Sequence, residues 1–139
     1  MKLILDTSVM VAALRSPTGA SAELLRMARH RKFDVLISVS MILEYEAVLK
    51  RPEHLSAAGL TAADVDSVLD AFCMFAKPVI NHFRWRPVLS DPDDDLVLET
   101  AVNGAADSIV TFNTADFQRA KTVFGIMVER PGETLRRIV

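Results

Sequence analysis

The strongest constraint on the fold is a pattern of short apolar runs that alternate with segments of helical spacing. Three of these runs, KLIL (2–5), DVLISVS (34–40) and SIVT (108–111), have the length and the apolar content of buried strands. Shorter strands are predicted at residues 77–80 and 125–129. Strands that alternate with helices favour a parallel sheet that is covered on both faces. We therefore predict an α/β fold with three layers (α/β/α) and a central, mostly parallel sheet of four to five short strands.

The segments between these strands carry apolar residues three or four positions apart, together with residues that start or stop helices. They predict helices over residues 7–14, 20–31, 41–50, 61–75, 91–103 and 115–120, and a final helix from residue 131. No linker, repeat or low-complexity segment divides the chain. Residues 1–139 are long enough to bury one core, so we predict a single domain.

The composition argues against several classes of protein. The net charge is −2, which disfavours a protein that holds nucleic acid mainly by bulk electrostatics. It does not disfavour a nuclease whose acidic residues are concentrated at a metal site. The apolar runs are shorter than a membrane span requires, and the single cysteine, Cys73, excludes an internal disulfide. We expect a cytoplasmic protein with no membrane partner.

Acidic residues follow or flank the predicted strands. Asp6 ends the first strand, Glu44 lies early in the helix after the second, and Asp94 opens the helix before the strand at 108–111. Asp116 follows that last strand. The carboxyl ends of parallel strands meet at one edge of a sheet, so these acids can converge there.

Each acid taken alone has a simpler explanation. Asp6 is followed by Thr and Ser and can be an ordinary helix cap. The run of aspartates at 93–95 is explained equally well by the helix dipole, and Glu44 by a surface position on an amphipathic helix. Together, however, they predict a site for a hard cation, because carboxylates are the ligands of Mg²⁺ and Mn²⁺. Such ions activate water in phosphodiester hydrolysis.

Other site types lack their sequence signals. The three histidines, His30, His54 and His82, have no zinc-ligand spacing, and no glycine-rich phosphate loop is present. A phosphatase of the haloacid-dehalogenase type would need a second aspartate two residues after the first, where this chain has Ser8.

The order ILDTSV, VSMILEYEAVL, DPDDDLVLETA and ADSIVTFNTADF resembles the PIN-domain family over residues 4–117. The DPDDD and IVTFN elements most resemble the VapC-like toxin components of toxin–antitoxin pairs. Each element is short, but their order and spacing together are specific. The resemblance implies a parallel sheet between helices and cleavage of RNA that depends on Mg²⁺ or Mn²⁺.

The resemblance also implies roles for individual residues. The family's first acid matches Asp6, its helix glutamate matches Glu44 with Glu46 as the nearby alternative, and its third acid matches Asp94. Many PIN enzymes carry a further acid where this chain has Asn113, a difference that should weaken a second metal. The predicted catalytic residues and metal ligands are Asp6, Glu44, Asp94 and Asp116. Residues predicted to orient these carboxylates or their waters are Thr7, Ser8, Asp91, Asp95, Thr111 and Asn113.

The partners implied by the resemblance are an RNA substrate, a small antitoxin protein and a second copy of the chain. Apolar residues on the helices at 20–31 and 61–75 are candidates for the homodimer surface. The basic residues predicted to contact RNA are Arg26, Arg29, Arg31, Arg84 and Arg86. Two alternatives remain open: a non-catalytic binding module that keeps the PIN fold, and a PIN nuclease of RNA maturation or decay.

Overall fold

The computed structural model describes residues 1–81 and 92–139, and its core is a sheet of five parallel strands. The strands are β1 (Lys2–Leu5), β2 (Asp34–Ile37), β3 (Lys77–Pro78), β4 (Ser108–Val110) and β5 (Met127–Glu129). They lie in the order β3-β2-β1-β4-β5, and every neighbouring pair is parallel. This confirms the predicted α/β fold, with a sheet that is entirely parallel over the described residues.

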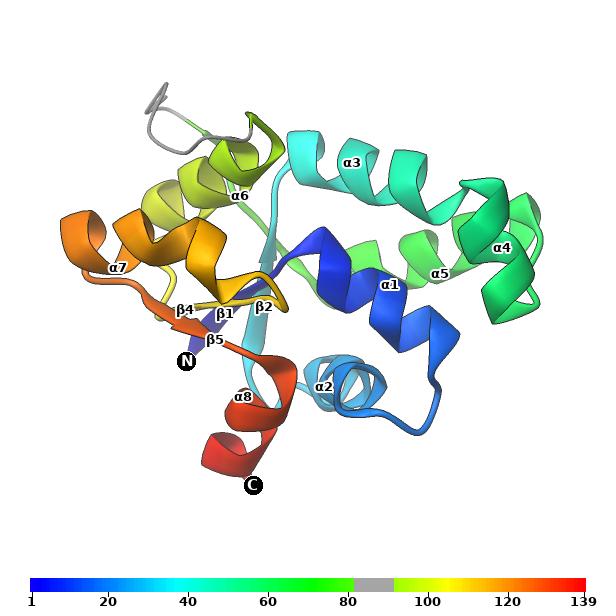
Figure 1. Cartoon of the computed structure of the whole chain (residues 1–139), viewed down its shortest axis with the longest axis horizontal. Helices are drawn as coiled ribbons and strands as arrows, with labels where there is room; N and C mark the ends of the chain where they lie inside the picture. Colours follow the sequence, from blue (N-terminus) through cyan, green and yellow to red (C-terminus); the bar gives the residue numbers. More distant parts are fainter. Residues whose placement is uncertain (82–91) are drawn as a thin grey trace.

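Helices cover both faces of the sheet. In Figure 1, α6 lies on one face, while α2 and α8 lie together on the other. The helices are α1 (Thr7–Arg15), α2 (Ala20–Arg29), α3 (Val39–Leu49), α4 (Pro52–Ala58), α5 (Ala62–Phe75), α6 (Pro92–Asn103), α7 (Gln118–Phe124) and α8 (Pro131–Ile138), with a 3₁₀ turn η1 (Thr114–Phe117) before α7.

The end of β2 and the presence of α4 differ from the prediction for identifiable reasons. The strand predicted over 34–40 ends at Ile37, because Ser38 caps α3 by accepting a hydrogen bond from the Met41 N–H. The helix α4 was not predicted, because Pro52 was interpreted only as the end of the preceding helix. Proline cannot continue a helix, yet its fixed φ suits the first turn of a new one, and Pro52 starts α4 in this way.

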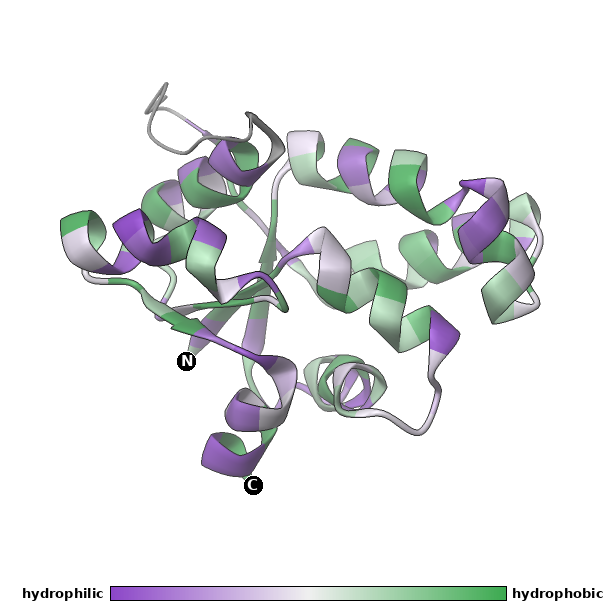
Figure 2. Cartoon of the chain, viewed as in Figure 1, coloured by the Kyte–Doolittle hydropathy of each residue, from purple (hydrophilic) through white to green (hydrophobic). Residues whose placement is uncertain are grey.

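The core lies between the sheet and its covering helices. The side chains of Leu3, Ile4 and Leu5 are fully buried, which explains why β1 is apolar after Lys2 instead of alternating. An edge-to-face ring contact between Tyr45 and Phe72, at 5.7 Å, joins α3 to α5, and Phe72 makes a second such contact at 5.3 Å with Phe75 of its own helix. Figure 2 shows α3 as hydrophobic along most of its length, interrupted by a hydrophilic band.

No helix within residues 1–81 and 92–139 combines the length and the apolar character that a membrane span requires.

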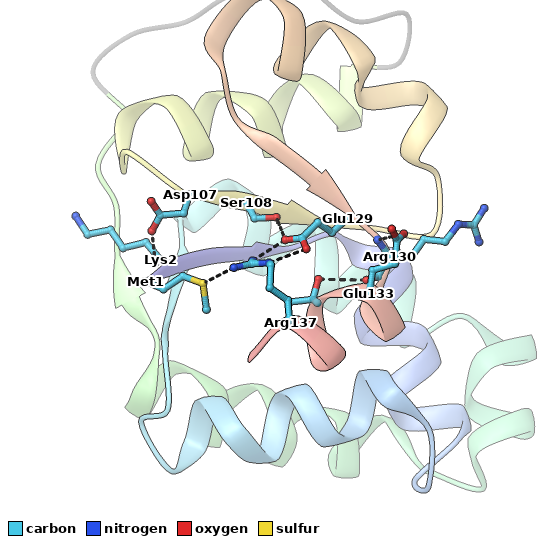
Figure 3. A network of polar contacts seen from close by, with 9 residues as sticks. Met1, Lys2, Asp107, Ser108, Glu129, Arg130, Glu133 and Arg137 are labelled. Atoms are coloured by element: carbon cyan, nitrogen blue, oxygen red, sulfur yellow. Dashed lines mark hydrogen bonds and ion pairs between the residues drawn. The ribbon is translucent and has the colours of Figure 1, made fainter. Parts of the chain in front are cut away.

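A polar network fastens α8 to the far side of the sheet (Figure 3). The Arg137 guanidinium donates from Nε and Nη2 to the two carboxylate oxygens of Glu129 on β5, at 2.9 and 2.7 Å. The buried Ser108 hydroxyl of β4 donates to the same carboxylate at 2.8 Å, and Arg137 also contacts the Met1 sulfur. Hydrogen bonds from Arg137, followed by the one from Ser108, lower the pKa of Glu129 below its usual range against the opposing effect of burial.

Replacing Arg137 by Met is expected to lower the free energy of unfolding at neutral pH by about 1–2 kcal/mol. The substitution leaves the carboxylate of Glu129 buried without its cation, while the partial exposure of Arg137 keeps the loss below that of a fully buried pair. A depressed carboxyl pKa adds stability above the unfolded value of about 4.3 and loses it as the pH falls through the folded pKa. The difference between wild type and variant should therefore shrink below about pH 4.

Urea unfolding at a series of pH values measures this difference directly. Arg136→Met is the matched control, since Arg136 is the neighbouring residue on α8 and is exposed. A difference that stayed constant down to the acid limit of folding would show that the Glu129–Arg137 charge pair is not its source.

Candidate active site at the carboxyl edge of the sheet

A cleft of about 520 Å³ opens where β1 ends and α1 begins. The sheet order places β1 at its centre, with β2 and β3 on one side and β4 and β5 on the other. The chain thus reverses its direction of winding beside β1, which is where parallel α/β sheets form ligand sites. Three acids from three different elements line this cleft: Asp6, Glu44 and Asp94.

Asp6 occupies the N-cap position of α1 but does not act as a cap. Its side chain makes no capping hydrogen bond to the helix, although the residue is only 6% exposed. Instead, its Oδ2 accepts hydrogen bonds from the hydroxyl of Ser8 at 2.7 Å and from that of Thr111 at 2.8 Å. Within the described ranges no donor contacts Oδ1. The structure thus contradicts the simpler explanation of Asp6 as a helix cap.

The two hydroxyls are themselves oriented by the loop that follows β4. The Asn113 N–H donates to Thr111 Oγ1 at 3.0 Å, and the Phe112 N–H donates to Ser8 Oγ at 3.3 Å. Each hydroxyl therefore accepts a backbone hydrogen bond and directs its own hydrogen to Asp6. This arrangement fixes the carboxylate in one orientation through contacts from both α1 and the β4 loop.

Tyr45 stabilises the backbone immediately before Asp6. Its side chain is fully buried, and its hydroxyl donates a hydrogen bond to the carbonyl oxygen of Leu5, the residue before Asp6. Burial, and then the negative charge of Asp6, raise the pKa of Tyr45 well above its usual value. The phenol therefore stays protonated and acts as a hydrogen-bond donor that holds the end of β1.

Glu44 and Asp94 bring the other two carboxylates to the cleft from α3 and α6. Both are partly exposed and line the cleft. The alternative glutamate of α3, Glu46, is exposed and lies 3.8 Å from Lys50. Asp95, beside Asp94, is 3% exposed and lies outside the cleft lining.

The remaining predicted site residues fall into three groups. Thr7, Ser8 and Asn113 line the cleft. Thr111 is not among the lining residues, but its hydroxyl donates a hydrogen bond to Asp6, which is. Asp116 is exposed on η1 and is not among the lining residues, so its role as a ligand stays a prediction. Asp91, Arg84 and Arg86 lie outside the described residues.

The predicted RNA contacts on α2 lie elsewhere. Arg26 is paired with Glu23 at 2.8 Å and donates to the carbonyl oxygen of Pro17. Arg26 and Arg29 border a separate apolar groove between α2 and α5. Arg31 precedes β2 and so belongs to the amino-terminal edge of the sheet, opposite the cleft. None of these three residues lines the cleft.

Sequence reasoning missed two basic residues of the cleft, Arg51 and His54. The signal that would have found Arg51 is its spacing in the sequence: Glu44, Val48 and Arg51 follow one another at four and then three positions, as residues on one helical face do, although Arg51 itself lies just beyond α3. The proline after Arg51 hid this pattern, because it was interpreted as the end of the helix.

The donor set of the cleft fits a hard cation better than a soft one. The three acids offer carboxylate oxygens, the amide of Asn113 offers another oxygen, and His54 is the one nitrogen ligand among the lining residues. Within residues 1–81 and 92–139, no three acidic, histidine or cysteine side chains stand close enough to hold a metal ion as placed. The carboxylates would have to turn toward one another to share a cation.

Comparisons with solved structures find the same fold in toxin–antitoxin complexes. VapBC2 from Rickettsia felis, bound to a DNA fragment from its promoter, matches with a TM-score of 0.62 and 17% identity over 94% of this chain and 98% of that chain. VapBC-1 from nontypeable Haemophilus influenzae matches with a TM-score of 0.63 and 13% identity over 95% and 99%. FitAB bound to the IR36 DNA fragment matches with a TM-score of 0.59 and 18% identity over 93% and 94%.

Sequence comparison gives the family. No protein with a curated description matches the chain. The family model described as the PIN domain matches residues 2–115, from the first residue of β1 into the turn after β4. This match covers most of the chain and includes Asp6, Glu44 and Asp94, so the protein belongs to the PIN-domain family.

Proposed function

We propose that the protein is an endoribonuclease that hydrolyses phosphodiester bonds of RNA with Mg²⁺ or Mn²⁺. The observation that carries the proposal is Asp6: a nearly buried carboxylate, oriented by two hydroxyls through one oxygen, that faces a cleft also lined by Glu44 and Asp94. A buried carboxylate costs free energy unless a cation or hydrogen bonds compensate it, and here the compensation leaves Oδ1 available. A divalent cation bound by these acids would offset their mutual repulsion.

The residues of the cleft have distinct roles in this proposal. Asp6, Glu44 and Asp94 would hold the cation, while Ser8 and Thr111 keep Asp6 in the orientation for binding. The bound ion supplies an activated water and neutralises charge on the scissile phosphate. Asn113 can add an amide oxygen but no charge, so the site carries one negative charge fewer than PIN sites with an acid there.

We further propose that the protein is the toxin of a toxin–antitoxin pair and that its partner is a small antitoxin. Support comes from three of the similar solved structures, two of VapBC and one of FitAB. The predicted homodimer remains a proposal of the same kind, and the apolar groove lined by Met10, Leu25, Phe72 and Phe75 is its candidate surface.

Removal of metal is the direct test of the nuclease. Purified protein free of any antitoxin is incubated with labelled single-stranded RNA in Mg²⁺, in Mn²⁺ and in EDTA. We expect cleavage with either ion and none in EDTA, with activity restored when excess ion is returned. The reason is that the chain's own side chains supply ligands but no activated water.

The same assay separates the alternatives. A folded protein that binds RNA and cleaves it with neither ion would be the non-catalytic PIN module. A metal-dependent nuclease whose expression does not arrest growth would instead belong to RNA maturation or decay.

A further inference from the structure

We propose that Arg51 binds a backbone phosphate of the RNA strand next to the phosphate that is cleaved. This inference rests on the proposed function and deepens it by assigning how the cleft holds its substrate. Arg51 lies at the N-cap of α4, is exposed, and lines the same cleft as Asp6, Glu44 and Asp94.

Arg51 is the arginine among the lining residues of the cleft, and its guanidinium differs from the paired basic groups of the molecule. Arg26 is paired with Glu23, Arg137 with Glu129, and Lys50 lies 2.6 Å from Asp66 and 3.8 Å from Glu46. Within residues 1–81 and 92–139, by contrast, no ion pair or side-chain hydrogen bond of Arg51 is found. An unpaired guanidinium in an acidic cleft is therefore available to an anion that enters the cleft.

The position of Arg51 relative to Glu44 indicates which phosphate of the RNA it can reach. Seven positions separate Glu44 on α3 from Arg51, which lies just beyond the end of that helix, so extending the helical rise to Arg51 puts the two residues about 10 Å apart along the axis. This separation leaves space for Arg51 to contact a phosphate next to the one at a metal ion held by Glu44. The planar guanidinium fork of Arg51 matches phosphate oxygens in a bidentate way.

The apolar lining of the cleft indicates the kind of contact. Val11 and Val48 also line the cleft, and their side chains offer no hydrogen bonds to base edges. Apolar surface of this kind accepts a ribose or a base face without selecting its sequence. Contacts at this end of the cleft should therefore position the strand through its backbone and contribute little to sequence preference.

His54 lies three residues after Arg51 and lines the same end of the cleft. It also lines a small apolar cavity with Leu49, Leu55 and Val65, and its Nδ1 is buried. Substitution of His54 would therefore mix changes in packing with changes in binding. Arg51 is exposed, so its substitution changes binding with little effect on packing.

The test compares Arg51→Gln and Arg51→Lys with Arg136→Gln, a matched control on α8 outside the cleft. Cleavage of labelled single-stranded RNA is measured in Mn²⁺ for each variant. For Arg51→Gln we expect KM to rise about tenfold, the value of one charged hydrogen-bonded contact, with kcat changed less than twofold. Arg51→Lys keeps the charge and should fall between the two, and the control should match wild type.

A second readout measures binding without cleavage. Fluorescence anisotropy of the same RNA is followed over a range of NaCl concentrations in Mn²⁺, with each Arg51 variant in the Asp6→Asn background. Loss of one phosphate contact should reduce the slope of log affinity against log salt by about 0.7 for Arg51→Gln, while Arg51→Lys keeps the slope. An unchanged KM together with an unchanged slope would overturn the role of Arg51 and leave the nuclease standing. A wild type that neither binds nor cleaves RNA would overturn both.

Discussion

Replacing Asp6 by Asn should reduce metal-dependent RNA cleavage by about 10³-fold or more, while the protein stays folded. The amide oxygen of asparagine can accept the two hydrogen bonds that Ser8 and Thr111 donate to Oδ2. The substitution therefore keeps the local geometry and removes the charge that faces the cleft. Under the proposed function, what is lost is an anionic ligand at a nearly buried position of the cleft.

The same variant gives a readout that does not depend on activity. Unfolding in EDTA should show a free energy within about 1 kcal/mol of wild type, because no hydrogen bond is lost and a buried charge is removed. Adding Mn²⁺ at a hundred times its Kd should stabilise wild type by about 2.7 kcal/mol and the variant by much less. Equal stabilisation of the two proteins by Mn²⁺ would mean that Asp6 is not a ligand.

The second large effect is expected at Glu44. Glu44→Gln should lower kcat/KM by about 100-fold, because it removes the charge of a carboxylate that lines the cleft from α3. Glu46→Gln is a closely matched control: it is the same substitution, in the same helix, two residues away and at an exposed position. It should leave cleavage within about twofold of wild type, since surface changes of this kind are usually small.

Steady-state cleavage in Mn²⁺ measures both variants side by side. If Glu46→Gln is the variant that loses activity, the helix glutamate of the PIN family corresponds to Glu46 and not to Glu44. If both variants retain wild-type activity, α3 supplies no ligand and the acids of the cleft are reduced to Asp6 and Asp94.

The sequence was most informative where one physical cause dominates. β1 was predicted with its observed bounds because three of its four residues are fully buried, and the pattern of short apolar runs led directly to a parallel sheet. The rule that parallel strands place ligands at their carboxyl ends then predicted which acids share an edge. In the structure Asp6, Glu44 and Asp94 line one cleft, although their role as ligands stays a prediction.

Prediction failed where a residue has two competing roles. Pro52 both ends one helix and starts the next, and interpreting only the first role concealed α4 and the position of Arg51. The support of Asp6 by Ser8 and Thr111 was predicted only as a list of candidates. Which hydroxyl reaches which oxygen depends on how the loop after β4 packs against the start of α1, and local sequence carries no signal for that.

The hydrogen bond from Thr111 to Asp6 joins residues 105 positions apart. It can form only after β4 has docked beside β1, with Ile4 opposite Ile109 and Leu5 opposite Val110. A ribosome must therefore synthesise most of this chain before the Asp6 carboxylate acquires its final orientation. Under the proposed function, nuclease activity would arise late in synthesis, when the domain closes as a unit, and a nascent or truncated chain that ends before β4 would be harmless to the cell that makes it.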